Sequence, residues 1–428
     1  MSDADQSEAL PMTASPQMDE AATRGRNTLA AVVVIGHAIK HIFNSGLQSL
    51  LLPEVKIGLG LNAAQFGSLL TARQFTSWGM TMGAGYLGDR FSNRAPLILG
   101  ISLSLLGVSF FIAGHAPNYS LMFGAMLLAG LGPALYHPPA LGELSRRFPD
   151  KRGFAISLHG AGGSAGEVIG PIVVAGLLTF MSWRGVFQVS LFPAVLSGVL
   201  VWGVMRSLFG REPETASSRD YFSSIALVLK NPVILVLVLI AAVRSAGDSA
   251  VGGFLPVYLR EDLDFSATRV AIYLSLGQVA GVATQPVMGH LSDTYGRKAI
   301  MIPGVAATAL LSLALSVVGT GMRLTLIVVA KGAFSFPLHH IFIAAAIDVA
   351  RGRMQSTVVA LIYGAGFLGT FSPILAGLIV DRYSIHSAFL YGGSVSLLAV
   401  VALFPLRLPS TARQLERAAA GRPRGDEA

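Results

Sequence analysis

Residues 28–52 constrain the fold more than any other stretch, because this run is apolar enough to cross a membrane and yet carries a lysine near its centre. At roughly 1.5 Å rise per residue, a helix of this length spans the hydrocarbon core of a bilayer. A lysine at mid-bilayer costs about 2.5 to 3.5 kcal/mol, so it normally faces a bundle interior or a polar cavity. We therefore expect this helix to line a polar path through a membrane protein. The polar side chains that share its one face are His37, Lys40, His41, Asn44 and Gln48.

The composition requires more than one such helix. Of the 428 residues, 53% are hydrophobic and only 13% are charged, which is more apolar surface than one soluble core can bury. The absence of cysteine excludes disulfides and thiolate metal sites. The net charge of +8 does not indicate a nucleic-acid partner, because the basic residues fall in short loops and form no continuous patch. The expected partner is a lipid bilayer.

The apolar runs form two sets of six, separated by the longest polar interruption at residues 207–230. Residues 1–27 and 409–428 are expected to be cytoplasmic tails, the first of them disordered, and 207–230 a cytoplasmic linker. We expect an all-α membrane protein with about twelve transmembrane helices in two pseudo-symmetric six-helix bundles, over residues 28–206 and 231–408. The runs are 28–52, 63–86, 95–114, 120–141, 153–180 and 185–205, then 232–258, 267–289, 299–319, 324–346, 357–380 and 388–408.

Lysine and arginine are distributed unequally between the two sides of these helices. About 21 fall in the loops and tails of one side, against roughly six on the other. Because positively charged loops stay in the cytoplasm, both termini are expected there, in a multi-pass protein of the bacterial inner membrane.

One motif occurs in each half, after the second apolar run. Gly85-Tyr-Leu-Gly-Asp89-Arg90-Phe-Ser-Asn-Arg94 recurs about 204 positions later as Gly289-His-Leu-Ser-Asp293-Thr-Tyr-Gly-Arg297-Lys298. Several agreements at one offset indicate an internal repeat, which places equivalent residues at equal depth in the two halves. The same offset aligns Lys40 with Arg244, Asn44 with Asp248, Gln74 with Gln278, and His159 with Tyr363.

The duplicated loop and the two sets of six runs are similar to the major facilitator superfamily over residues 29–408. Within it, three segments resemble the fosmidomycin-resistance efflux family: His41-Ile-Phe-Asn44 with Gln48-Ser-Leu, Tyr136-His137-Pro138, and His159-Gly-Ala-Gly-Gly followed by Gly170-Pro171. The resemblance implies a monomeric secondary transporter, not an enzyme, that works by alternating access and exports its substrate.

The sequence departs from the family pattern at three positions. Ser92 replaces a glycine in the first loop, and Thr294 replaces a basic residue in the second, so gating contacts are expected to differ between the halves. Met126 stands where many drug/proton antiporters carry an arginine. Proton-coupled drug efflux of that type is therefore not favoured.

Lys40 and Arg244 are the leading candidates for binding a substrate. Two cations at equal depth in two halves can hold one anion between them while the halves rock. The alternative is that Arg244 pairs with Asp248 one turn along its helix, leaving Lys40 to hydrogen-bond Asn44 or His41. The resemblance implies a similar arrangement in organophosphate antiporters, with a histidine in helix five. The further residues expected in this site are His41, Asn44, Gln74, His159, Gln278 and Tyr363.

Cations outnumber acids within the predicted spans, so a cavity that they line would attract anions. Arg73 and Lys331 could equally pack against other helices. The basic set is Lys40, Arg73, Arg244 and Lys331 with His37, His41, His137, His159, His339 and His340, against Glu167, Asp248 and the more peripheral Glu143 and Asp348.

Four residues are candidates for carrying a coupling proton. Glu167 lies mid-helix in a glycine-rich segment, where a buried carboxylate suits proton coupling or only packs helices through a hydrogen bond. Asp248 is its rival, and His37 and His137 can titrate near neutral pH. His37 and His41 also have the spacing of a metal pair, but no carboxylate accompanies them on that helix, so neither a metal nor another cofactor is expected.

The repeated loop is expected to gate the transporter, since ion pairs at helix ends can hold one conformation closed and break in the other. The alternative is charge that only sets topology. The gating candidates are Asp89, Arg90, Arg94, Asp293, Arg297 and Lys298.

These observations predict a transporter of a small organic anion, such as a phosphonate or carboxylate, coupled to protons. The outward direction of transport is what the family resemblance implies. Uptake or exchange of an anionic nutrient is the alternative within transport. A sensor that binds without flux, and a polytopic enzyme that uses a histidine cluster, are the alternatives of other classes.

Overall fold

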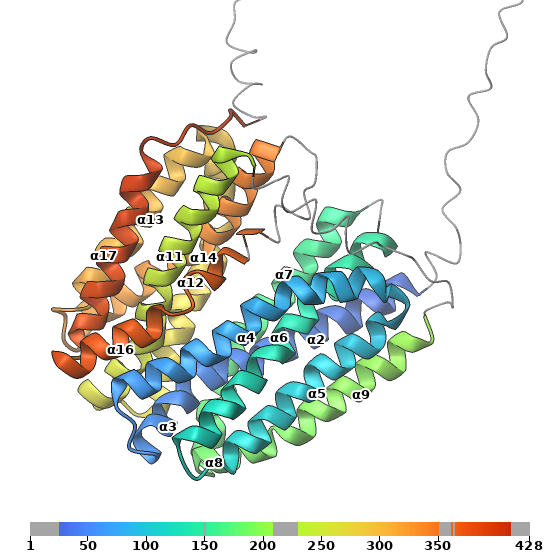
Figure 1. The fold of residues 1–428 in the computed structure, drawn as a ribbon, viewed down its shortest axis with the longest axis horizontal. Helices are drawn as coiled ribbons and strands as arrows, with labels where there is room; N and C mark the ends of the chain where they lie inside the picture. Colours follow the sequence, from blue (N-terminus) through green and yellow to red (C-terminus); the bar gives the residue numbers. More distant parts are fainter. Residues whose placement is uncertain (1–24, 149–150, 209–229, 351–360, 363, 412–428) are drawn as a thin grey trace, which may run out of the picture.

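The computed structural model describes residues 25–148, 151–208, 230–350, 361–362 and 364–411 (Figure 1). Every regular element among these residues is helical. The N-terminal half comprises α2 (Arg26–Gly46), η1 (Leu47–Leu51), α3 (Leu52–Gly58), α4 (Ala63–Arg90), η2 (Ser92–Arg94), α5 (Ala95–Gly114), α6 (Tyr119–Arg147), α7 (Arg152–Leu178), α8 (Trp183–Val189) and α9 (Leu191–Arg206). The C-terminal half comprises α11 (Pro232–Val257), η3 (Tyr258–Asp262), α12 (Ala267–Tyr295), α13 (Arg297–Ala314), α14 (Met322–Ala350), η4 (Ala365–Phe367), α16 (Ser372–Arg382) and α17 (His386–Leu403).

The predicted fold class is confirmed: this is an all-α membrane protein built as two six-helix bundles. Within the described ranges, 10 helical segments are long and apolar enough to cross a membrane. The first of them is continuous from Arg26 to Gly58, over α2, η1 and α3. The 28-residue helix α4 is not among the ten, although it packs inside the bundle. Polar residues such as Arg73 and Gln74 lower its hydropathy.

The repeat extends to the turns between helices. The second loop copy passes from α12 to α13 through Gly296 alone, whose φ of 100° is readily adopted only by glycine. At the equivalent place in the first copy stands Ser92, and there the chain passes through the 3₁₀ turn η2 before α5 begins. The substitution noted in the sequence therefore changes how the chain turns between these helices.

A glycine stripe brings α7 against α2. A Cβ atom added at Gly166 would lie 2.2 Å from the Ala38 carbonyl oxygen, and one at Gly170 would lie 2.7 Å from that of Ile42. Only glycine permits such a backbone approach. The stripe also fixes the height of Glu167 relative to the polar face of α2.

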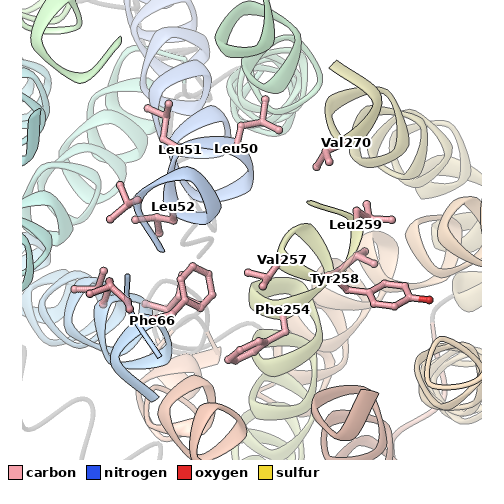
Figure 2. Close-up of a cluster of buried hydrophobic side chains, with 14 of the residues drawn as sticks. Leu50, Leu51, Leu52, Phe66, Phe254, Val257, Tyr258, Leu259 and Val270 are labelled. Atoms are coloured by element: carbon pink, nitrogen blue, oxygen red, sulfur yellow. The ribbon is translucent and has the colours of Figure 1, made fainter. Parts of the chain in front are cut away.

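The two halves are joined at the end of the bundle that is remote from the α9-to-α11 connection. Figure 1 shows the bundles diverging from that joint toward the end where α9 stops and α11 starts. We call these the distal end and the linker end. Figure 2 shows the apolar part of the joint, where Leu51 and Phe66 lie on one side and Phe254 and Val270 on the other. The Phe66 and Phe254 rings meet edge to face with centroids 5.4 Å apart.

Polar contacts at the distal end also cross between the halves. Lys56 Nζ lies 2.6 Å from Glu261 Oε2, and Arg260 Nε lies 2.5 Å from Glu54 Oε1. The basic members of the two pairs, Lys56 and Arg260, are equivalent positions of the repeat, whereas their acidic partners, Glu261 and Glu54, are not. Asp381 accepts hydrogen bonds from the backbone amides of residues 63 and 64 at the start of α4, which suits an anion at a helix N-terminus.

Candidate functional site

The polar face of α2 meets α6 and α7 inside the N-terminal half. His37 and Lys40 are buried, with exposed fractions of 4% and 1%. His159 of α7 stacks on His37 with ring centroids 3.7 Å apart, and His137 of α6 stands edge-on to His37 at 4.8 Å. Four imidazoles and one lysine thus form a cluster, which we call the histidine cluster: His37, Lys40, His41, His137 and His159.

A chain of polar contacts runs along one side of the histidine cluster. His37 Nδ1 donates to the backbone oxygen of His159 at 2.7 Å, and the Nε2 atoms of His37 and His41 lie 3.0 Å apart. At the other end of the chain, His41 Nδ1 lies 3.0 Å from Glu167 Oε1, in ion-pair contact and not in line for a straight hydrogen bond. Glu167 is the most accessible member, with 30% of its side chain exposed.

Lys40 interacts with histidine and not with the partners considered from sequence. Its ammonium donates to His137 Nε2 at 2.5 Å and lies 6.0 Å from the Tyr136 ring centroid. Tyr136 in turn donates its hydroxyl to the Val33 carbonyl, which ties α6 to α2. Lys40 is therefore held at the contact between these two helices.

The C-terminal half holds a second charged group, centred on Asp248. Arg244 Nη1 lies 2.6 Å from Asp248 Oδ2, which is the same-helix pairing weighed as the alternative for Arg244. Lys331 Nζ lies 3.4 Å from Asp248 Oδ1, and the Ser335 hydroxyl donates to Oδ2 at 3.0 Å. The Arg244 guanidinium also lies over the Phe342 ring, 5.6 Å from its centroid. Two cations thus surround one carboxylate.

The two glutamines aligned by the repeat make reciprocal contacts across the halves. Ser249 of α11 donates to Gln74 Oε1 of α4 at 3.5 Å, and Gln278 of α12 donates to Ser45 of α2 at 3.3 Å. Ser45 and Ser249 are themselves separated by the repeat offset. The pseudo-twofold axis therefore passes between these pairs, and both glutamines lie at the interface of the halves.

The remaining sequence-derived residues are dispersed around these groups. Asn44 lies on α2 with no hydrogen-bond partner for its side-chain oxygen, and both ring nitrogens of His159 likewise have none among the described residues. Gln285 contacts His340 at 2.9 Å on the C-terminal side. Tyr363 and the side chains of Gln48 and Asp89 lie outside the described residues.

The gating candidates that are described make contacts within their own halves. Arg297 forms ion pairs with Asp293 and Asp348, the latter at 2.8 Å, and Lys298 donates to the Phe404 carbonyl at 2.5 Å. Arg90 and Arg94 are exposed at the linker end, both near the Phe91 ring. These contacts are compatible with a linker end at which the halves are apart.

Sequence reasoning did not identify the charged residues that join the halves at the distal end. Lys56 and Glu261 are 205 positions apart, and local spacing cannot reveal a contact over such a separation. The signal that could have found them is the repeat itself, because Lys56 and Arg260 are basic at equivalent positions, each close to an acidic residue.

Three of the cluster histidines are close enough to consider a metal ion. One nitrogen from each of His37, His41 and His137 lies within 4.8 Å of the others. Their hydrogen bonds already use these atoms, and the Lys40 ammonium donates to one of them and would repel a dication. We therefore assign these histidines to the hydrogen-bonded network and not to a metal.

Comparison with known proteins agrees with this architecture. The family model described as Major Facilitator Superfamily matches residues 34–284 and 237–426. An uncharacterized MFS-type transporter of Bacillus subtilis strain 168, YfnC, is 22% identical over 402 residues, covering 90% of this chain and 94% of the relative. The fosmidomycin resistance protein of Escherichia coli strain K12 is 24% identical over 399 residues, covering 89% and 94%.

A solved structure shows the same fold. The nucleoside transporter NupG superposes with a TM-score of 0.70 at 14% identity, covering 88% of this chain and 98% of that one. The relatives and the fold are those of membrane transporters, so the family resemblance predicted from the repeated loop is confirmed. The chain belongs to the Major Facilitator Superfamily.

Proposed function

We propose that this transporter moves a small organic anion, such as a phosphonate or a carboxylate, across the bacterial inner membrane by alternating access. The observation that carries the proposal is the charge balance around Asp248, where Arg244 and Lys331 surround a single carboxylate. Among the described residues one positive charge remains uncompensated there, and a charge held away from water is costly until it is paired. A bound anion supplies that pairing.

Lys40 contributes a second positive centre in the N-terminal half, at the depth equivalent to Arg244. Its hydrogen-bond acceptor is an imidazole, which leaves its charge available to an anion. Because Lys40 is 1% exposed in this conformation, an anion reaches it only after the helices rearrange. We propose that the path between the two centres is lined by His41, Asn44, Gln74, His159, Gln278 and Tyr363.

The conformation supports a role for the distal ion pairs as one of two gates. Positively charged loops support a cytoplasmic linker end. In that orientation the joined distal end faces outward and the halves diverge toward the cell interior. The linker-end set, which is Asp89, Arg90, Arg94, Asp293, Arg297 and Lys298, then closes when the distal end opens. The same positive loops support a cytoplasmic location for both termini and for the linker. We propose that the protein works as a monomer.

Proton-coupled export is the direction that we propose first. The relative named for fosmidomycin resistance supports export of a phosphonate-like compound. Candidates for the proton are Glu167, Asp248, His37 and His137. Uptake or exchange of an anionic nutrient is the second candidate, and the position of Asp248 favours it. An incoming anion would compete with this carboxylate for Arg244 and Lys331, just as two exchanged anions compete for one site.

Flux into proteoliposomes tests the substrate class. Methylphosphonate and oxalate should exchange in counterflow, whereas glucose and ethidium should not. Arg244→Gln and Lys331→Gln should each weaken saturable anion binding about tenfold or more. The control is Arg323→Gln, which removes an exposed cation from the same helix as Lys331 and should leave binding unchanged. Normal anion affinity in both Arg244→Gln and Lys331→Gln would exclude the proposed site.

A further inference from the structure

A row of polar contacts leads from the His159 backbone through His37 and His41 to Glu167, and its geometry indicates how many hydrogens these groups share. It has three links: the His159 carbonyl oxygen to His37 Nδ1 at 2.7 Å, His37 Nε2 to His41 Nε2 at 3.0 Å, and His41 Nδ1 to Glu167 Oε1 at 3.0 Å. Both ends of the chain are oxygens, a carbonyl and a carboxylate. The first two links are hydrogen bonds, and each needs one hydrogen. The third is an ion-pair contact that is not in line for a straight hydrogen bond, but an unprotonated ring nitrogen and a carboxylate oxygen 3.0 Å apart repel each other, so this contact also favours a hydrogen.

The three contacts together therefore favour three hydrogens, but two neutral imidazoles supply only two. The carbonyl oxygen forces a hydrogen onto His37 Nδ1, so a neutral His37 accepts from His41 Nε2. A neutral His41 then presents a lone pair to Glu167. The third hydrogen resides on His37, on His41 or on the Glu167 carboxyl, and each position makes the contact between His41 and Glu167 attractive.

The surroundings make this extra proton exchangeable. Lys40 and Arg73 lie within electrostatic reach of His41 and oppose further positive charge there. The other titratable groups that face the chain are His137 from α6, His159 from α7 and, across the interface of the halves, His340 from α14 near Glu167. Glu167 is the one carboxylate among these groups. With 30% of its side chain exposed, it is also the member through which a proton enters or leaves.

Asp248 is a poorer carrier, because its hydrogen-bonding and ionic partners already suit the ionised form. Both of its oxygens are engaged, by Arg244 and Ser335 on one and Lys331 on the other. Each partner donates and none requires a hydrogen from the carboxyl group. Unlike the His41–Glu167 contact, this arrangement is complete without a further proton.

We propose that His37, His41 and Glu167 share one exchangeable proton, and that this is the proton coupled to transport. The coupling to transport rests on the proposed function, whereas the shared proton is inferred from the contacts of His37, His41 and Glu167. Glu167 and His41 carry the proton, while His37 is a positioning residue that fixes the tautomer through the His159 carbonyl. Release returns Glu167 to a free carboxylate and leaves the two imidazoles neutral.

Glu167→Gln tests the proposal, because an amide can donate to His41 Nδ1 and completes the chain with no extra proton. In proteoliposomes, Glu167→Gln should keep methylphosphonate counterflow within about twofold of wild type while accumulation driven by a pH gradient falls about tenfold or more. Asp248→Asn is the control and should retain its response to the pH gradient in whatever flux remains. His37→Asn should shift the pH profile of flux without abolishing counterflow. Normal pH-driven accumulation in Glu167→Gln would overturn the proposal.

A second measurement separates this proposal from the substrate assignment. Nitrogen-15 NMR of the purified protein labelled at histidine should show one strongly coupled imidazole that titrates in wild type and becomes neutral in Glu167→Gln. If no anion of the panel is transported but this titration is present, the proposed function fails and the shared proton stands. If His37 and His41 are both neutral and unaffected by Glu167→Gln, and infrared spectra show no protonated carboxyl lost with Glu167, the shared proton is excluded.

Discussion

Lys56 and Glu261 approach to 2.6 Å across the interface of the two halves, and Arg260, the repeat equivalent of Lys56, makes a second such pair with Glu54. The four side chains are between 15% and 32% exposed. Single exposed ion pairs contribute only about 0 to 1 kcal/mol. Two pairs that lie beside the apolar joint of Leu51, Phe66 and Phe254 can nevertheless bias an equilibrium between two conformations.

Charge reversal should open the distal end. Lys56→Glu places like charges opposite each other and should shift the population toward the conformation with the distal end apart. The chain has no cysteine, so spin labels can be attached at Thr179→Cys and Met322→Cys. Both positions are exposed at the distal end, one in each half. Double electron–electron resonance between the labels then measures the opening. Lys56→Glu combined with Glu261→Lys should restore the wild-type distance distribution. An unchanged distribution in the single variant would show that the apolar joint alone holds this end closed.

The packing of α7 on α2 offers a matched pair of glycines. Gly166→Ala would place a methyl group 2.2 Å from the Ala38 backbone oxygen, and this contact cannot relax by moving a flexible side chain. Overpacking of this kind costs about 1 to 3 kcal/mol, so the melting temperature in detergent should fall. Gly160→Ala on the same helix meets nothing within 4 Å and should leave the melting temperature nearly unchanged or raise it. Equal melting temperatures for both variants would contradict the observed helix approach.

The sequence was sufficient for the fold because each step depended on local pattern. Apolar run length predicted the helices, with α5 reproduced at the predicted 95–114, and the repeat offset predicted that Lys40 and Arg244 occupy equivalent helices. The ion-pair partner of each charged side chain could not be predicted in the same way. Whether Arg244 turns to Asp248 or toward the other half depends on its rotamer and on Lys331, which comes from a helix 83 positions away from Asp248.

Contacts between helices that are distant in sequence also explain why the role expected for His41 differs from the contacts that it makes. The sequence pattern favours substrate binding for His41, yet its contacts are with His37 and Glu167. Those contacts depend on the registry of α7 against α2, which the glycine stripe sets through Gly166 and Gly170. Spacing along one helix reveals the shared face of His37 and His41, but it cannot reveal which carboxylate the second helix brings to them.

Removing the internal carboxylate should strengthen anion binding. Asp248 holds Arg244 and Lys331, so a substrate anion must compete with it. Asp248→Asn keeps the size of the side chain and frees both cations, and the affinity for methylphosphonate should rise about threefold to tenfold if the protein remains folded. Calorimetric titration measures the affinity, and the melting temperature checks the fold. Weaker binding by a folded Asp248→Asn protein would mean that Asp248 helps to hold the substrate.

The pH dependence of anion affinity should follow from the shared proton on His37, His41 and Glu167. An anion is attracted by this added positive charge, so the anion and the proton should strengthen each other's binding, by the reciprocity of linkage. Affinity for methylphosphonate should therefore fall as the pH rises through the range in which the proton is lost. With one proton involved, the change is at most about tenfold per pH unit.

Glu167→Gln should flatten this pH dependence, whereas Arg323→Gln should preserve it. The sign also decides between the two proposed directions of transport: the fall in affinity with rising pH expected from the shared proton would favour the second candidate, uptake, over the export that is proposed first. Positive linkage makes the proton and the anion travel together, which under an inward proton gradient drives uptake, whereas export by antiport requires that each ligand expels the other. If the anion affinity instead rises with pH, and Glu167→Gln removes this rise, then proton and anion weaken each other's binding. That outcome would support antiport with Glu167 still part of the proton site.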